Sequence, residues 1–286
     1  MKYLTSVLIT VTVLITAGAC VQSNNDPVIK EWTKIVDGKK VHYMTIDGVM
    51  VHEKDPKKQP LPPVVEPGTC STQEKAGKAP SDAIVLFDGT EKAFKDEWEH
   101  ARKDSKGRWQ FADGYFYPQK RSGYLQTKKK FGSCQLHLEF ATPEKVKGSG
   151  QGRGNSGVFL MGTYEVQILD SYNNTTYADG QLGALYGRSK PLVNPARKPG
   201  QWQTYDIIFH QPEFDKDGNV VKKATFTVLL NGVLIQDHVV LSGGTGWNGP
   251  HAATHYKAHP DKLPLSLQDH GNPIKFRNIW IRELCD

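Results

Sequence analysis

Glu165 and Gln167 are two side chains in the middle of the chain whose types and spacing suit acid–base chemistry. They alternate with apolar residues along the run Tyr164–Leu169, which is typical of a β-strand. Successive side chains of a strand point to opposite faces, so the row that begins at Tyr164 faces the core, and Glu165, Gln167 and Leu169 share the other face. A carboxylate can move a proton, and an amide can orient a polar ligand. An ordinary solvated sheet face is the alternative interpretation.

Two further runs, Cys134–Phe140 and Leu263–Gly271, repeat this arrangement of one apolar row and one polar row. The polar rows comprise His137 and Glu139 in the first run, and Ser266, Gln268 and His270 in the second. If these strands neighbour the strand of Glu165, the three polar rows converge on one concave patch.

The elements that must position these groups are short. From Ala83 onward, apolar runs of three to nine residues alternate with turn residues, and no long stretch has the 3.6-residue period of a helix. The clearest hairpin turn is Asn231-Gly232, and a second hairpin is expected between Gly157–Met161 and the strand of Glu165. This pattern predicts an all-β, antiparallel sandwich.

The N-terminus resembles an export signal. Met1–Ala19 has a charged start and an apolar stretch, and small residues then lead directly to Cys20, as in a bacterial lipobox. We therefore expect residues 1–19 to be a signal peptide and Cys20 to be the lipidated first residue of an exported, membrane-anchored protein. An ordinary secretory peptide, cleaved nearby, is the alternative.

The remaining chain divides into three parts. Residues 20–54 are expected to form a tether and a small β-meander, because Asp37-Gly38 and Asp47-Gly48 are turn signals. Residues 55–82 are rich in Pro, Lys and Gly and are expected to be a linker. Residues 83–286 form the main domain.

The composition excludes some partners. The net charge of +6 comes from dispersed basic residues, apart from short runs such as Lys128–Lys130. No basic strip with interleaved aromatic residues is present, so no nucleic-acid partner is expected. Cys134 lies on the core row of its strand and is expected to be a buried free thiol. A Cys70–Cys285 disulfide is conceivable in an exported protein, but the sequence leaves the connectivity open.

Two motifs suggest ligands less directly. The segment Gly148–Gly157 holds five glycines but lacks the ending of a phosphate loop, so Arg153 and Asn155 are expected in a polar loop at the mouth of a site, or in a simple hairpin loop. His251, His255 and His259 recur every four residues, which would place them on one face of a helix as metal ligands. No local carboxylate or cysteine completes that set, so a solvated loop is favoured. Core packing is favoured for Trp202.

Several short motifs together resemble the 3-keto-disaccharide hydrolase family, long known only as a domain of unknown function. The resemblance covers residues 83–284. The motifs are Leu86-Phe87-Asp88-Gly89-Thr90, Gly152-Arg153-Gly154-Asn155-Ser156-Gly157-Val158, Tyr164-Glu165-Val166-Gln167-Ile168-Leu169-Asp170, Gly183-Ala184-Leu185-Tyr186-Gly187, Gly200-Gln201-Trp202, Leu230-Asn231-Gly232, Leu267-Gln268-Asp269-His270-Gly271 and Phe276-Arg277-Asn278-Ile279. The resemblance implies a concanavalin A-like jelly-roll sandwich that acts on glycosides whose sugar carries a ketone at C3. It also implies a sugar 3-dehydrogenase in the same pathway.

A C3 ketone acidifies the proton on C2, so a base can form an enolate that expels the group on C1, after which water adds back. For this elimination the expected base is Glu165, followed by Glu139. The expected enolate stabilisers are His270 and Arg153, the expected acid is His137, and the expected substrate-binding residues are Arg153, Asn155, Gln167, Tyr186 and Gln268. Direct displacement between Glu139 and Glu165 is the alternative. A divalent cation held by Glu and His side chains would be another stabiliser, and the spacing identifies none.

Two other classes of function remain open at this point. A lectin-like domain would use the same face to bind carbohydrate without turnover. A surface-assembly component would use it to bind another protein.

Overall fold

The computed structural model describes residues 28–36, 38–51, 62–104, 108–246 and 254–284. The chain divides into two compact units, Met1–Val64 and Val65–Asp286. Cys20 and the predicted signal peptide lie outside the described residues. No described helix is both long enough and apolar enough to cross a membrane.

The first unit contains the predicted meander. Its strands β1 (Ile29–Val36), β2 (Lys39–Ile46) and β3 (Val49–Val51) form one antiparallel sheet. The turn between β2 and β3 is Asp47-Gly48, with φ of 53° and 80°. The positive φ at both positions explains the Asp-Gly signal in the sequence. The first strand, β1, lies before the two runs on which the prediction was based.

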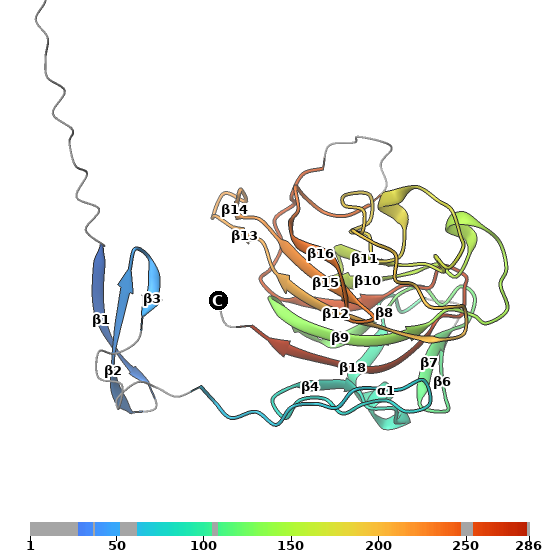
Figure 1. The fold of residues 1–286 in the computed structure, drawn as a ribbon, viewed down its shortest axis with the longest axis horizontal. Coiled ribbons are helices and arrows are strands. Elements are labelled where there is room, and N and C mark those ends of the chain that lie inside the picture. Colours follow the sequence, from blue (N-terminus) through green and yellow to red (C-terminus); the bar gives the residue numbers. More distant parts are fainter. Residues whose placement is uncertain (1–27, 37, 52–61, 105–107, 247–253, 285–286) are drawn as a thin grey trace, which may run out of the picture. The chain divides into compact units, whose positions relative to one another are not determined.

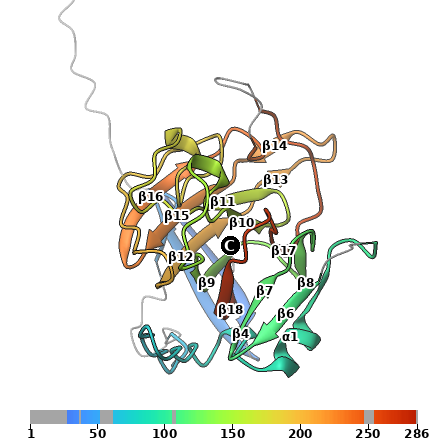
Figure 2. The ribbon, with the colours of Figure 1, turned by 90° about the vertical axis from the view of Figure 1, so that its right-hand side faces the viewer.

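The second unit is a sandwich of two antiparallel sheets (Figures 1 and 2). The larger sheet has the order β16-β15-β12-β9-β18-β7-β6, with β4 also paired to β18. Its strands are β4 (Ile84–Phe87), β6 (Trp109–Ala112), β7 (Tyr115–Pro118), β9 (Cys134–Ala141), β12 (Trp202–His210), β15 (Thr225–Leu230), β16 (Val233–Val240) and β18 (Lys275–Glu283).

The smaller sheet has the order β11-β10-β17-β8-β5. Its strands are β5 (Trp98–His100), β8 (Leu125–Phe131), β10 (Ser156–Leu160), β11 (Tyr164–Ile168) and β17 (Leu263–Leu267). A separate small hairpin pairs β13 (Glu213–Phe214) with β14 (Val220–Lys222), and short helical segments are α1 (Glu91–Glu97), η1 (Gly150–Gly152) and η2 (Ala178–Gly180). With 42% strand and 6% helix, the predicted all-β jelly-roll sandwich is confirmed.

The hydrophobic core lies between the two sheets and follows the predicted alternation. Leu136 and Leu138 of β9 and Val166 and Ile168 of β11 are at most 1% exposed and belong to one cluster. One prediction on this strand is wrong. Leu169 was placed on the same face as Glu165, but β11 ends at Ile168 and Leu169 turns into the core.

The hairpin of β10 and β11 has the predicted position and a regular register, with Val158 opposite Val166 and Phe159 opposite Glu165. Met161 and Gly162 form its turn with φ of 53° and 64°. Met161 adopts the left-handed region without being glycine, and its side chain is buried in the core. The packing of this side chain offsets an unfavourable backbone conformation.

The predicted linker is not a linker over its second half. Residues 65–82, which we call the strap, belong to the same compact unit as the sandwich. The strap is bound to the larger sheet by the Gln73 amide, which hydrogen-bonds to the backbone of Trp202. Asp82 also binds it, accepting three hydrogen bonds from Arg282 at 2.6, 2.9 and 3.0 Å. The composition rich in Pro, Lys and Gly that suggested a linker belongs here to a segment held by polar contacts.

The alternation in β11 gives a stability prediction. Ile168→Ala should lower the free energy of unfolding by about 2–5 kcal/mol, because the fully buried side chain leaves a cavity in the core. Ile208→Ala is the matched control, since Ile208 lies on the outer face of β12 and is 38% exposed. Chemical denaturation measures both. Equal losses would mean that the two faces of these strands are wrongly assigned.

Candidate active site

A polar row crosses the outer face of the smaller sheet. Cross-strand pairing brings one residue from each of the five strands into register along this row: Glu165, Phe159, Ser266, Gln126 and Glu99. The strands β11 and β17 lie on either side of β10, so Glu165 and Ser266, from two of the three predicted runs, share one face of the sheet, one strand apart. These two runs therefore share a face, although their strands are not direct neighbours.

Glu165 is the most unusual residue of the row. Its side chain is only 6% exposed, and within the described part of the chain no hydrogen bond or ion pair reaches its carboxylate. The bare backbone of Gly157 makes room for it, since a Cβ atom there would lie 2.3 Å from Glu165 Oε1. The interpretation as a solvated face is therefore wrong at this position.

Burial raises the pKa of Glu165 to about 8. The cause is desolvation, which penalises the charged carboxylate when no partner replaces its water. A carboxyl with a pKa near neutrality can accept or donate a proton at physiological pH, which an ordinary carboxyl does poorly. Glu165 thus has the properties of an acid–base catalyst.

The backbone around Glu165 is fixed by neighbouring loops. Its N–H donates to Thr245 Oγ1 at 2.8 Å, and its carbonyl accepts from the N–H of Tyr186 at 3.3 Å. Thr245 in turn donates to the carbonyl of Thr163 at 3.0 Å. These contacts hold the edge strand β11 and therefore fix the position of the carboxylate.

Gln167 lies next on the same face and connects the strand to the glycine-rich loop. Its Nε2 donates to Gln151 Oε1 at 3.0 Å, and Asn155 Nδ2 donates to the carbonyl of Gln151 at 2.8 Å. Gln167 is 1% exposed, and its Oε1 is buried with no hydrogen-bond partner among the residues that the structure describes. Asn155 holds the loop in place, while Gln167 retains an unused acceptor close to Glu165.

Aromatic residues line the same face. Tyr124 Oη accepts a hydrogen bond from Gln268 Nε2 at 2.9 Å, so its own proton is available to a ligand. Its ring packs edge-on against Phe159, with centroids 5.2 Å apart. Burial raises the pKa of Tyr124, and the charge of Glu165 raises it further, so the two groups lie within electrostatic reach.

Tyr186, a predicted substrate-binding residue, pairs with Tyr177 through their hydroxyl groups at 2.6 Å. Burial raises the pKa of Tyr177, with smaller contributions from Tyr186 and from Glu165. The charge of Glu165 therefore influences a tyrosine on each side of the row, Tyr124 and Tyr177.

His270 and Arg153, the expected enolate stabilisers, differ in whether their side chains are free to bind a substrate. His270 is exposed and follows Gln268, whose N–H donates to the carbonyl of Gly157 at 3.1 Å. Arg153 is occupied, because it donates to Asp170 Oδ2 at 2.7 Å and to the carbonyl of Tyr172 at 2.9 Å. The geometry thus assigns Arg153 to holding its loop rather than to a free guanidinium at the row.

Glu139 and His137 are not part of this site. Both project from the outer face of β9 in the larger sheet, while Glu165 projects from the outer face of β11 in the smaller sheet. The core separates the two faces. The predicted convergence is therefore wrong for the β9 run, and Glu139 and Glu165 do not flank a common bond.

Glu139 lies instead in a buried ionic network beneath the strap. Arg277 Nε donates to it at 2.7 Å, Asn278 Nδ2 donates at 2.7 Å, and Ser71 of the strap also donates. Burial alone would raise the pKa of Glu139, but hydrogen bonds from His137, Ser71, Asn278 and Arg277 lower it to about 2. A carboxyl with this pKa remains ionised and is a poor proton donor.

His137 belongs to the same network. Its Nδ1 lies 2.7 Å from Asp206 Oδ1, and its ring stacks on Trp280 with centroids 4.8 Å apart. Burial lowers its pKa, but the hydrogen bonds to Asp206 and Glu139 outweigh burial and raise the pKa to about 9.

Trp202, for which core packing was favoured, lies outside the core. The Arg277 guanidinium is 4.2 Å from its ring centroid.

The other predicted groups are accounted for as follows. Cys134 is a buried free thiol, as predicted, and burial raises its pKa to about 12. Cys70 is exposed and free in the structure, and Cys285 lies outside the described residues. His251 also lies outside them, and residues 254–260 are not helical. No three potential metal ligands cluster within the described ranges.

Sequence reasoning missed Tyr124, Phe159 and Tyr177. Tyr124 directly precedes β8, and by alternation it lies on the same outer face as Gln126. Its orientation could therefore be predicted from the sequence. Its proximity to Glu165 was not readable, because that depends on β17 lying between β8 and β10.

Comparison with known proteins identifies the family of this fold and site. Residues 82–282 match the family described as 3-keto-alpha-glucoside-1,2-lyase-like domain, and the chain belongs to it. A crystal structure of a candidate glycosyl hydrolase from Parabacteroides distasonis is 45% identical, with a TM-score of 0.73, over 83% of this chain and 98% of its own. A second candidate glycosyl hydrolase from the same organism is 20% identical over 71% of this chain and 94% of its own, with a TM-score of 0.49. Among curated proteins, none matches the chain.

The network of Glu139 predicts a structural role for this residue. Glu139→Gln should lower the free energy of unfolding by about 3–5 kcal/mol, because Arg277 then remains buried without its anion. Glu213→Gln is the control, since its pair with Lys222 is about half exposed and worth less than about 1 kcal/mol. If Glu139→Gln removes turnover while the stability is unchanged, Glu139 is catalytic and this assignment is wrong.

The environment of Glu165 predicts a pH-dependent cost to folding. The folded protein holds the pKa at about 8 against a usual value of 4.5, so it favours the protonated form. The protonated Glu165 contributes its full stability to the folded state below pH 4.5, and this contribution to the free energy of unfolding is lost as pH rises towards 8. Glu165→Gln should therefore gain in melting temperature relative to the wild type as pH rises through this window.

The exposed Glu99 lies in the same row, so Glu99→Gln is the matched control for removing a carboxyl from this face. Differential scanning calorimetry across the window measures both variants. A difference between Glu165→Gln and the wild type that stays constant with pH would contradict the raised pKa of Glu165.

Proposed function

We propose that this protein cleaves the glycosidic bond of 3-keto-glycosides by elimination, with Glu165 as the base. The observation that carries the proposal is a buried, unpartnered carboxyl of raised pKa on a row of polar and aromatic side chains. The family to which the chain belongs, and the naming of its relatives as candidate glycosyl hydrolases, support the reaction class.

The steps follow from the chemistry of the ketone. Glu165 takes the proton from C2, and the electron pair of that bond forms the enolate with the C3 carbonyl. The enolate then expels the C1 oxygen, which leaves as an alcohol and takes up a proton, so the sugar becomes an unsaturated ketone. Water adds across that double bond, with hydroxyl at C1 and hydrogen at C2. The net result is hydrolysis.

Neighbouring groups supply the remaining contacts. Tyr124 can donate its free hydroxyl proton to a substrate oxygen, because Gln268 already occupies its acceptor side. The unpartnered Oε1 of Gln167 can accept a hydrogen bond from a sugar hydroxyl. His270 remains a candidate for stabilising the enolate, since its ring is exposed on the loop that follows β17.

The direct-displacement alternative is disfavoured by geometry. It requires two carboxylates on either side of the glycosidic bond. Glu139, the predicted partner, lies beyond the core and is held in its ion pair with Arg277. A lectin-like function would use the aromatic rings of the row equally well. A lectin, however, has no need for a carboxyl that is buried without a partner at a cost to stability.

The substrate must come from an oxidation. A C3 ketone arises when a dehydrogenase removes hydrogen from the C3 hydroxyl of a glycoside, so an enzyme of this class is the proposed supplier. We also propose that the protein is exported and anchored through lipid on Cys20, which places both reactions outside the cytoplasm.

The reaction is tested by comparing a 3-keto-glucoside with its parent glucoside in heavy water. The wild type should cleave the keto compound, leave the parent nearly untouched, and release keto sugar that carries deuterium at C2 above a no-enzyme control. Glu165→Gln should lose cleavage and exchange together, because one base serves both. As the base must be ionised, kcat/KM should rise with pH towards a plateau above about 8.

Any of four outcomes would overturn this mechanism. Efficient cleavage without deuterium at C2, or a rate that falls as pH rises through 8, would indicate displacement with Glu165 as an acid. Equal cleavage of the keto compound and its parent would remove the role of the ketone. Binding of both compounds without any turnover would favour the lectin-like function.

The anchoring is tested separately. Cys20→Ala should move the protein from the membrane fraction to the soluble fraction, because lipid attachment requires the thiol. Cys70→Ala is the control and should leave the distribution unchanged, since Cys70 lies in the second unit. A Cys20→Ala protein that remains in the membrane fraction would refute the lipid anchor.

A further inference from the structure

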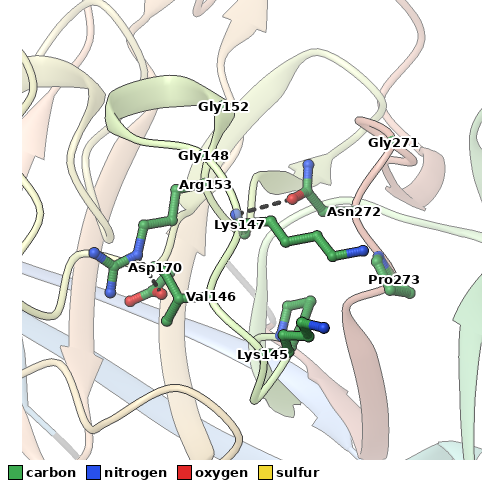
Figure 3. A pocket seen from close by; sticks show the side chains of 12 residues that line it. Lys145, Val146, Lys147, Gly148, Gly152, Arg153, Asp170, Gly271, Asn272 and Pro273 are labelled. Carbon is green, nitrogen blue, oxygen red and sulfur yellow. Dashed lines mark hydrogen bonds and ion pairs between the residues drawn. The ribbon is translucent and has the colours of Figure 1, made fainter.

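A cavity of about 470 Å³ lies at one end of the smaller sheet. It is formed by the loop after β9, by the glycine-rich loop before β10, by Asp170 beyond the end of β11, and by residues 271–273 beyond the end of β17. Figure 3 shows these segments around the cavity, with Asn272 bonded to the backbone of the glycine-rich loop at 3.0 Å.

The cavity carries an excess of positive charge. Its charged lining consists of Lys145, Lys147, Arg153 and Asp170. Arg153 and Asp170 neutralise each other at 2.7 Å, and in Figure 3 Arg153 points away from Pro273 towards Asp170. The Lys147 side chain extends towards Asn272 and Pro273, and neither lysine has an ion pair within the described residues. Two unneutralised ammonium groups therefore face one hollow.

The cavity lies beyond the end of β11, on the same strand as Glu165. Glu165 lies three residues before the end of β11, about 10 Å at 3.3 Å per residue, and Asp170 follows two residues after that end. The loop of residues 268–273 connects the two places, since Gln268 binds Tyr124 beside Glu165 and Asn272 lines the cavity. A glycoside with its sugar at Glu165 would extend its leaving group along this loop towards the cavity.

We propose that this cavity is the leaving-group subsite and that it selects an anionic leaving group, such as an aryl or sugar group that carries a carboxylate. The proposal rests on the function proposed above. Lys145 and Lys147 are point charges on flexible side chains, so they suit a carboxylate whose position varies from one substrate to the next. A Cβ atom at Gly152 would meet nothing within 4 Å, so this part of the lining faces open space.

The test uses two substrates that differ in charge and little in shape: the 3-keto-glucosides of 4-hydroxybenzoate and of 4-hydroxybenzamide. The wild type should show a higher kcat/KM ratio for the anionic over the neutral substrate than Lys145→Gln/Lys147→Gln, by about fivefold, through KM. Added salt should shrink the difference. Comparing ratios cancels the intrinsic reactivity of the two leaving groups.

Lys216→Gln/Lys223→Gln is the matched control, because it removes the same two charges from exposed positions outside the cavity lining. It should keep the wild-type ratio. An unchanged ratio in the Lys145/Lys147 variant, or an equal loss in the control, would overturn the subsite.

Failure of the subsite and failure of the proposed function are distinguishable. If no 3-keto-glucoside is cleaved, the proposed function has failed, and the subsite is then tested by equilibrium binding of the unoxidised 4-carboxyphenyl and 4-carbamoylphenyl glucosides. Tighter binding of the anionic compound by the wild type, lost in Lys145→Gln/Lys147→Gln, supports the subsite. Equal binding of both compounds overturns it.

Discussion

The hydrophobic core between the two sheets determines which polar side chains of this chain can act together. Each strand of the sandwich has two faces and gives one of them to the core. Polar rows of strands in one sheet therefore share a face, as Glu165 and Ser266 do on either side of Phe159. Polar rows of different sheets lie on opposite sides of the molecule, as Glu165 and Glu139 do. A site in this fold is built within one sheet and from the loops at its ends.

The two carboxyls show that burial alone does not decide a pKa. Glu139 and Glu165 are 1% and 6% exposed, and both lie mid-strand. Hydrogen bonds from His137, Ser71, Asn278 and Arg277 outweigh the burial of Glu139 and lower its pKa to about 2. Glu165 has no such partner among the described residues, and burial raises its pKa to about 8. The alternation of side chains along a strand places both residues on an outer face and does not distinguish them. The difference lies in partners that come from distant parts of the chain, which include Ser71 of the strap.

This explains what the sequence could and could not predict. Alternation correctly placed Val166 and Ile168 in the core, and the residue types of β11 singled out Glu165, whose side chain is buried. Alternation carries no information on which strands are neighbours, so the residues of β9 were grouped with a site that lies across the core. The strap was missed for a related reason, because its hydrogen bonds to the sheet leave no periodic pattern in the sequence.

The absence of a partner for Glu165 fits the task of a base that acts on carbon. A buried carboxyl costs folding free energy unless it is paired, and an ion pair like that of Glu139 with Arg277 would remove this cost. The same ion pair would lower the pKa and weaken the base, and the C2 proton beside a ketone is only weakly acidic. Desolvation strengthens the base without adding a group that competes for the proton. The bare backbone of Gly157 leaves the carboxylate room without supplying a donor, so the fold sacrifices some stability at Glu165 to keep its basicity.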